Sequence, residues 1–415
     1  MQLACSRCSP IRISCEEYAR IRLTRELASS VNFIDGTIPP VREIVIVISD
    51  LYLAPGQTDL PPGAGALGTL PGFEHAARFG QRRSIEGEGG WRPWLARWLG
   101  HDDLATLAPA VIAAAAVDAA TSPAATPSHA SFAAATSPAA APSHASTTWL
   151  ATPVHLIAGL TSLHLDRRSI LRLPPADLEH FAQDFNQTFG DSDLHLLPLP
   201  AGDFLMQGPA TLTATTTEPA RALVADLETS LPKGKDAKAL KRLGAELEMW
   251  LHAHPLNETR RRRGELPVST LWLWGGGSSP VSPAGSLAAP PTGSPTERTD
   301  LAFGNDPYLT GLWRLHGDRS QPLPEQIANL LEDPHAQRAI LVTGITPMLH
   351  RNPHWTVFES LAEIDRLFVS PAIAALREGV VESVVLIPNN TDLRVARHDR
   401  LKLWRRPRPA LVGLQ

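Results

Sequence analysis

The pattern of hydrophobic and polar positions begins with a continuous apolar run at residues 43–50 (EIVIVISD). Its β-branched residues are typical of a strand buried on both faces, as in a parallel sheet. Further apolar runs predict strands at residues 339–343, 381–387 and 393–404, and a helical spacing predicts a long helix at residues 356–378. Alternating strands and helices predict an α/β protein with a mainly parallel sheet, flanked by helices and with an antiparallel C-terminal edge.

The remaining apolar patterns are shorter. Helices are predicted at residues 71–80, 175–189, 240–251 and 308–316. Strands are predicted at residues 154–160, 162–165, 194–199, 203–206 and 271–274, with 194–199 and 203–206 forming a hairpin.

Two segments rich in Pro, Ala, Ser and Gly interrupt these patterns, and the first holds a repeat of ATSPAATPSHAS as ATSPAAAPSHAS. Such segments have too few large apolar residues to build a core. The predicted organisation is a disordered N-terminal extension (1–40), a first part of the α/β core (41–104), a disordered low-complexity insertion (105–147), an α/β segment ending in the WLWGGG strand (148–277), a linker (278–300) and a C-terminal part of the core (301–415).

Composition narrows the class of protein. A chain of 415 residues that is 43% hydrophobic can bury a large core, and a net charge of -4 argues against a general nucleic-acid binder. Cys5, Cys8 and Cys15 are the only cysteines; their single C-x-x-C pair does not predict a zinc site, and they cannot form a disulfide scaffold. No apolar run reaches membrane-spanning length. We therefore expect a cytoplasmic protein without a membrane or nucleic-acid partner.

Candidate ligand-binding residues gather before and after one strand. Arg260, Arg261, Arg262 and Arg263 follow Asn257, and guanidinium groups suit phosphates and carboxylates. The strand LWLW is followed by Gly275, Gly276 and Gly277, which would let the backbone approach another group closely. Neither a P-loop nor a dinucleotide-binding pattern is present. Asp50, at the end of the first buried strand, lies where open α/β sheets place their sites.

Residues 254–277 (HPLNETRRRRGELPVSTLWLWGGG) resemble the archaeal-type, cofactor-independent phosphoglycerate mutases. They resemble more closely a proteobacterial family named "regulatory protein, RpfE type". Other blocks of the chain resemble the mutases more weakly and occur in the same order as in the mutases. These are the strand ending at Asp50, residues 70–80, residues 309–317 (LTGLWRLHG) and residues 359–376 with their AEID.

The resemblance implies an alkaline-phosphatase-like fold and phosphoryl transfer through a serine, with two metal ions held by Asp and His. Several expected ligands are absent. Leu51 replaces a glycine after Asp50, residues 341–349 lack the expected Asp, and Asn389 with Asn390 stand where Asp-His is expected. Asn is a poor substitute for an anionic ligand of Mn²⁺ or Mg²⁺. Ser84 is a candidate for the serine.

Three interpretations remain open. In the first, the chain is a divergent, non-catalytic relative without a cofactor, which binds a phosphorylated small molecule and has a regulatory role, with a regulatory protein as a possible partner. In the second, it is an active phosphomutase or phosphatase that interconverts 2- and 3-phosphoglycerate with Mn, Zn or Mg. In the third, it is an interaction scaffold without a ligand. The candidate metal ligands are Asp50, His350 and His354, with His316, Asp318 and Asp392 as further candidates.

Overall fold

The computed structural model describes residues 43–52, 70–117, 146–159, 163–209, 214–223, 227–278, 299–331 and 336–401. The predictions for the N-terminal extension with its cysteines, for the repeat and for most of the linker lie outside these residues. Within the residues described, none of the helices is long and apolar enough to cross a membrane.

A six-stranded sheet has the strand order β2-β12-β11-β1-β10-β9. Its parallel strands are β1 (Glu43–Ile48), β9 (Thr299–Phe303), β10 (Ala336–Thr343) and β11 (Ser383–Pro388). The antiparallel strands β12 (Thr391–Ala396) and β2 (Gln81–Ser84) complete one edge. The predicted α/β class, with a mainly parallel sheet and an antiparallel edge, is confirmed.

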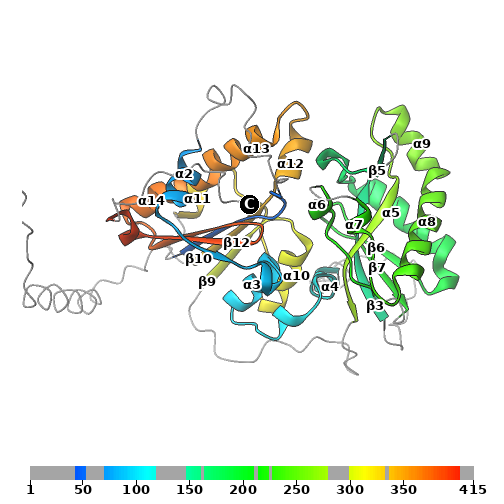
Figure 1. Cartoon of the computed structure of the whole chain (residues 1–415), viewed down its shortest axis with the longest axis horizontal. Coiled ribbons are helices and arrows are strands. Elements are labelled where there is room, and N and C mark those ends of the chain that lie inside the picture. The colour runs from blue at the N-terminus through cyan, green and yellow to red at the C-terminus, as the bar shows by residue number, and fades with distance from the viewer. Residues whose placement is uncertain are drawn as a thin grey trace, which may run out of the picture. The chain divides into compact units, whose positions relative to one another are not determined.

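Strand β1 is central because both of its faces are apolar. Ile44, Ile46 and Ile48 are fully buried on one face, and Val45 and Val47 on the other. The isoleucines pack under α2 (Pro71–Phe79), α13 (Val357–Ile364) and α14 (Ser370–Glu378), and the valines pack over α3 (Trp91–Trp98) and α10 (Pro307–His316) (Figure 1). Helices on both sides of the sheet therefore follow from the near-continuous apolar run.

The predicted helix at residues 356–378 contains a wider turn. A π-helical turn, Asp365–Val369, separates α13 from α14. The carboxylate of Asp365 accepts hydrogen bonds from the backbone N–H groups of Gly72 (3.2 Å) and Phe73 (2.9 Å), at the start of α2. Such turns interrupt helices where a side chain has a particular role; here Asp365 satisfies donors that the first turn of α2 leaves unpaired.

A second, antiparallel sheet has the order β6-β7-β3-β8. Its strands are β6 (His195–Pro198), β7 (Phe204–Pro209), β3 (Ser146–Val154) and β8 (Thr270–Ser278). Strands β6 and β7 form the predicted hairpin. Helices α5 (Pro175–Phe189) and α8 (Ala237–His252) bury their leucine and phenylalanine side chains against this sheet.

The boundaries of the predicted insertion at residues 105–147 are wrong at both ends. Helix α4 (Pro109–Val117) lies within this range, and its Ala110 and Ile112 are fully buried. Strand β3 begins at Ser146, inside the range predicted as insertion and well before the predicted strand at residues 154–160. The alanine-rich sequence of α4 resembles the adjacent repeat in composition, but its Val and Ile side chains pack against α10 and β8.

The other elements are short. They are α6 (Pro219–Ala222), α7 (Leu227–Ser230), α9 (Pro255–Arg262), α11 (Ala328–Leu331), α12 (Ile345–Arg351), the hairpin of β4 (Ile157–Ala158) and β5 (Leu163–His164), and 3₁₀ turns that include η4 (Arg167–Ser169) and η7 (Arg397–Leu401). The predicted C-terminal strand thus ends at Ala396 and continues as η7.

The three glycines belong to β8 and face protein atoms. Gly275 (φ 61°) and Gly276 lie opposite Trp149 at a register shift between β3 and β8, as in a β-bulge that begins with a left-handed glycine. A Cβ atom on Gly276 would lie 2.1 Å from the Trp149 ring, and one on Gly277 would lie 2.4 Å from Ala108. The close approach that the glycines permit is therefore to Trp149 and to the start of α4.

We expect Gly276→Ala to lower the free energy of unfolding by about 1–3 kcal/mol, the usual cost of overpacking a core. The methyl group would collide with the indole of Trp149. Gly244→Ala is the matched control, because Gly244 is half-buried in α8 and a Cβ atom there meets nothing within 4 Å. The control should be neutral or more stable by up to about 1 kcal/mol. Urea unfolding measures both; equal midpoints would contradict the packing argument.

Candidate functional site

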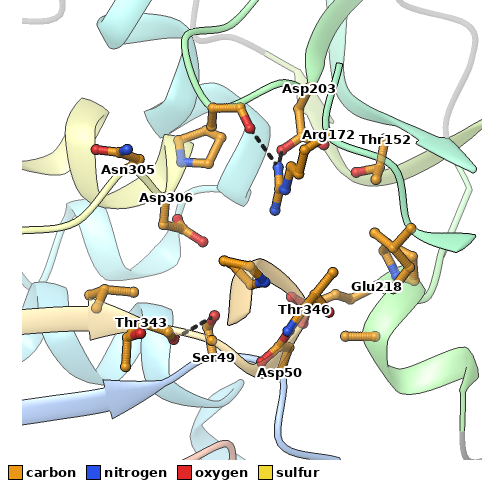
Figure 2. A pocket seen from close by; sticks show the side chains of 18 of the residues that line it. Ser49, Asp50, Thr152, Arg172, Asp203, Glu218, Asn305, Asp306, Thr343 and Thr346 are labelled. Atoms are coloured by element: carbon orange, nitrogen blue, oxygen red, sulfur yellow. Dashed lines mark hydrogen bonds and ion pairs between the residues drawn. The ribbon is translucent and has the colours of Figure 1, made fainter. Parts of the chain in front are cut away.

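A cleft of about 400 Å³ lies at the carboxyl ends of the parallel strands β1, β9 and β10. Ser49, Asp50, Thr343 and Thr346 line the side formed by the parallel sheet (Figure 2). The opposite side includes Thr152, Arg172, Asp203 and Trp274, which come from the antiparallel sheet and its connections. Ligand sites in open α/β sheets occur at this end of the strands.

Asp50 connects β1 to the start of α12. Its Oδ1 accepts a hydrogen bond from the backbone N–H of Ile345 (2.5 Å), and its Oδ2 accepts one from that of Thr346 (2.8 Å). Gly344 permits this approach, since a Cβ atom there would lie 2.8 Å from Oδ1 of Asp50. Asp50 thus follows β1, and its carboxylate has two backbone donors; the catalytic and metal-binding roles predicted for it stay predictions.

Arg167 holds the backbone that follows β1. Its guanidinium donates hydrogen bonds to the carbonyl oxygens of Asp50 and Tyr52. Burial lowers the pKa of Arg167, and the charge of Asp50 opposes that shift. Because Arg167 lies in η4, which follows β5, this contact joins the end of β1 to the part of the chain that carries the antiparallel sheet.

Arg92 is buried between two indole rings. Its guanidinium carbon lies 4.5 Å from the ring centroid of Trp91 and 4.7 Å from that of Trp274. It also donates hydrogen bonds to Glu218 (2.9 Å) and Asp306 (3.4 Å). Burial opposes its charge, but the two carboxylates raise the pKa of Arg92 above its ordinary value. The WLWGGG strand therefore contributes to the cleft through Trp274.

Arg172 extends into the cleft (Figure 2). Its Nη1 donates to Asp203 and to the carbonyl oxygen of Ala201 (3.1 Å), while Nε and Nη2 have no hydrogen-bond partner among the residues described. The side chain is 36% exposed. Burial opposes its charge, but the charges of Asp203, Asp306 and Asp50 raise the pKa of Arg172 above its ordinary value. Arg172 therefore presents a free, charged edge to the cleft.

The four carboxylates that line the cleft all have donors within the protein. Asp50 accepts from the amides of α12, Asp203 from Arg172, and Glu218 from Arg92. Asp306 accepts from the backbone N–H groups of Tyr308 and Leu309 at the start of α10, as well as from Arg92. Each of these carboxylates therefore has an internal partner, while Oδ1 of Asp203 is buried and has no hydrogen-bond partner among the residues described.

Several donors in the cleft remain available. Besides the unpaired N–H groups of Arg172, the exposed Arg351 lines the cleft; it has no hydrogen bond or ion pair to the residues described, and its charge contributes to lowering the pKa of Glu363. The hydroxyl of Thr346 is buried there and has no hydrogen-bond partner in the described part of the chain. An excess of unpaired donors over unpaired acceptors favours an anionic ligand.

The predicted anion-binding residues around α9 are not among the residues that line this cleft. Asn257 is buried, and its side chain bonds to the backbone of Leu251 (2.7 Å) and Val268 (2.8 Å). Asn257 thus holds the connection between α9 and β8 in place. Gly275, Gly276 and Gly277 are likewise absent from the lining.

The four arginines have partners of their own. Arg260 is buried and contacts Asp177 (2.7 Å) and Glu265 (3.0 Å). Arg261 (3.1 Å) and Arg262 (3.7 Å) contact Glu258, and Arg263 lies 3.8 Å from Asp177. Arg260 therefore has a structural role, because its charge is neutralised inside the protein, whereas the role predicted for the three exposed arginines stays a prediction.

The predicted metal ligands do not assemble. No group of three or more His, Cys, Asp and Glu residues in the described ranges is placed to hold a metal ion. His350 lies 3.3 Å from the carbonyl oxygen of Arg168, and burial lowers the pKa of His350. His354 is exposed on the loop after α12. With Asp50 bound to backbone amides, the residues present do not fit the two-metal site that the resemblance implies.

The other candidates are dispersed. His316 contacts His101 (2.8 Å), Asp318 is exposed, and Asp392 lies on β12. Ser84 is exposed on the edge strand β2, opposite Thr391 of β12, and does not line the cleft. Asn389 (φ 62°) and Asn390 form the turn between β11 and β12. Asn tolerates this left-handed conformation, which accounts for one Asn where the resemblance led us to expect a metal ligand.

Sequence reasoning missed Arg92, Arg172, Asp203 and Thr346. No motif marks them. Arg172 and Asp203 are 31 residues apart, and each is an isolated charge in its own segment. Only the folded chain brings them to one cleft.

No family model matches this chain, and no curated protein matches it. Among solved structures, the PH0037 protein from Pyrococcus horikoshii is similar with a TM-score of 0.40 and 13% identity, over 84% of this chain and 82% of that one. The cofactor-independent phosphoglycerate mutase from Thermoplasma acidophilum DSM 1728 is similar with a TM-score of 0.33 and 14% identity, over 86% of this chain and 90% of that one. These distant likenesses assign no residue and no activity.

We expect Asp50→Ala to lower the free energy of unfolding by about 1–2 kcal/mol, because it removes the acceptor for two backbone donors at the start of α12. Asp318→Ala is a suitable control, since that carboxylate is exposed and, among the residues described, accepts a hydrogen bond only from the backbone N–H of Arg319. Chemical unfolding compares the two variants. A loss no larger than that of the control would show that the cap does not stabilise the fold.

His254 generates a prediction about pH. It is buried, its Nδ1 accepts the backbone N–H of Leu256 (3.2 Å) at the start of α9, and burial lowers its pKa from 6.5. Below pH 6.5 the unfolded chain takes up a proton that His254 resists in the folded protein. The free energy of unfolding therefore decreases as the pH is lowered.

His254→Asn should reduce this pH dependence, because Asn can also accept at the N-cap position but does not titrate. Histidines away from His254 are the same in both proteins and cancel in the comparison. His180 lies against His254, so His180→Asn is introduced into both proteins to remove its contribution. Unfolding in urea between about pH 7 and about pH 5.5 measures the difference. Parallel pH curves for the variant and the wild type would contradict a neutral, capping His254.

Proposed function

We propose that this chain is a divergent phosphoglycerate mutase-like protein that binds a small phosphorylated or carboxylated molecule in the cleft and acts as a regulatory protein of the cytoplasm. The observation that carries the proposal is the excess of unpaired hydrogen-bond donors over unpaired acceptors in the cleft. Its four carboxylates have internal donors, while Arg172, Arg351 and Thr346 have donors without partners among the residues described.

The chemistry of Arg172 supports an anion rather than a neutral ligand. A guanidinium can donate two parallel hydrogen bonds to one carboxylate or phosphate, and only Nη1 of Arg172 is used by Asp203 and Ala201. A volume of about 400 Å³ also lies within the range of small-molecule sites. The resemblance of residues 254–277 to the "regulatory protein, RpfE type" family supports the regulatory role.

The active mutase is the second candidate, and the donor set weighs against it. Two-metal phosphoryl transfer needs carboxylate and imidazole ligands gathered around each ion. Asp50 is bound to two backbone amides, and His350 and His354 do not join it in a metal-binding group within the residues described. Interconversion of 2- and 3-phosphoglycerate by the purified protein with Mn²⁺ would establish this candidate and displace our proposal.

Calorimetric titration with inorganic phosphate and with 3-phosphoglycerate tests the proposal. Arg172→Ala should weaken binding about tenfold or more, because hydrogen bonds from a charged donor contribute about 1.5–3 kcal/mol. Arg261→Ala is the matched control, since Arg261 is exposed, pairs with Glu258 and lies outside the cleft. Equal losses in the two variants would place binding elsewhere. If neither probe bound, the scaffold interpretation would be favoured.

A further inference from the structure

Three aspartate carboxylates line the cleft that the guanidinium of Arg172 enters. Asp203 pairs with it directly, and Figure 2 shows Asp306 and Asp50 on other sides of the same cavity. The electrostatic influence of both on Arg172 agrees with this arrangement. The three acids come from separate elements: the turn before β7, the N-cap of α10 and the end of β1.

A cavity that gathers carboxylates usually holds a cation, because unpaired negative charges repel one another in a medium of low dielectric. Mg²⁺ and Mn²⁺ serve this purpose in many proteins through carboxylate oxygens. Here the compensating charge is covalently part of the chain. Unlike a metal ion, Arg172 has a single positive charge and donates hydrogen bonds in a fixed plane.

We propose that the guanidinium of Arg172 takes the place of a divalent cation in this cleft, so that the protein binds its anionic ligand without a metal. Nη1 of the guanidinium holds Asp203, and the N–H groups that remain unpaired among the residues described are left for the ligand. The part of this proposal that concerns the ligand rests on the proposed function. The part that concerns the cation does not, because it follows from Arg172 and the acids alone.

Two other arginines near the cleft keep their acidic neighbours when Arg172 is replaced. Arg92 stays with Glu218 and Asp306, and Arg167 stays beside Asp50. Asp203 has no ion-pair partner other than Arg172 in the described part of the chain, and it is buried. A neutral residue at position 172 therefore leaves one buried carboxylate uncompensated, with two further carboxylates facing the same cavity.

Titration with Mn²⁺ alone, followed by calorimetry or by the paramagnetic signal of free Mn²⁺, tests the cation part without any anion. We expect Arg172→Gln to bind Mn²⁺ at least tenfold more tightly than the wild type. Adding Asp203→Asn to that variant should abolish the gain. Arg351→Gln is the matched control, because it removes an arginine of the same cleft that has no ion pair with the described acids, and it should show no gain.

A second measurement needs no variant. Binding of inorganic phosphate or 3-phosphoglycerate to the wild type should be unchanged after treatment with EDTA and after addition of Mn²⁺.

The proposal is overturned if EDTA weakens the binding of these anions, or if the wild type binds Mn²⁺ as tightly as Arg172→Gln. It is also overturned if Arg172→Gln shows no gain in Mn²⁺ binding although its thermal melt shows that it is folded. Absence of anion binding together with a gain of Mn²⁺ binding would refute the proposed function and leave the role of Arg172 intact.

Discussion

The carboxylate of Asp50 is the contact on which the arrangement of the cleft depends. It satisfies two backbone donors at the start of α12, where unpaired N–H groups would otherwise carry a desolvation cost. The main-chain carbonyl oxygen of Asp50 accepts a hydrogen bond from Arg167. Arg167 belongs to the part of the chain that forms the antiparallel sheet. One residue at the end of the central strand thus sets the positions of α12, of Thr346 and of the opposite side of the cleft.

The pairing of charges around Asp50 reflects the free-energy cost of burying a charged group. A carboxylate or guanidinium inside a protein destabilises the fold unless it has a partner of opposite charge or several hydrogen bonds. Arg92 with Glu218, and Arg172 with Asp203, meet this requirement. The same pairing removes acids from metal binding and leaves the donors of Arg172 for a ligand.

The differences between the sequence analysis and the structure share one origin. Helix α4 was assigned to a low-complexity insertion because its alanines match the neighbouring repeat in composition. Composition alone cannot indicate that Ile112 packs on α10. The arginines of α9 suggested a ligand because four adjacent charges are conspicuous in a sequence. In the fold, Arg260 neutralises the buried Asp177, 83 residues away.

The sequence by itself determined three strands of the parallel sheet, β1, β10 and β11, and the alternation of strands and helices, because burial on two faces imposes a local pattern of apolar residues. It also placed Asp50 at the end of the first strand. It did not predict β9. Only the tertiary structure decided the chemistry of the cleft. Arg172 and Asp203, or Asp50 and Ile345, are distant in sequence, and the pairing of charges depends on approach in space. For the LWLWGGG strand, a sequence cannot distinguish glycines that admit a ligand from glycines that admit the ring of Trp149.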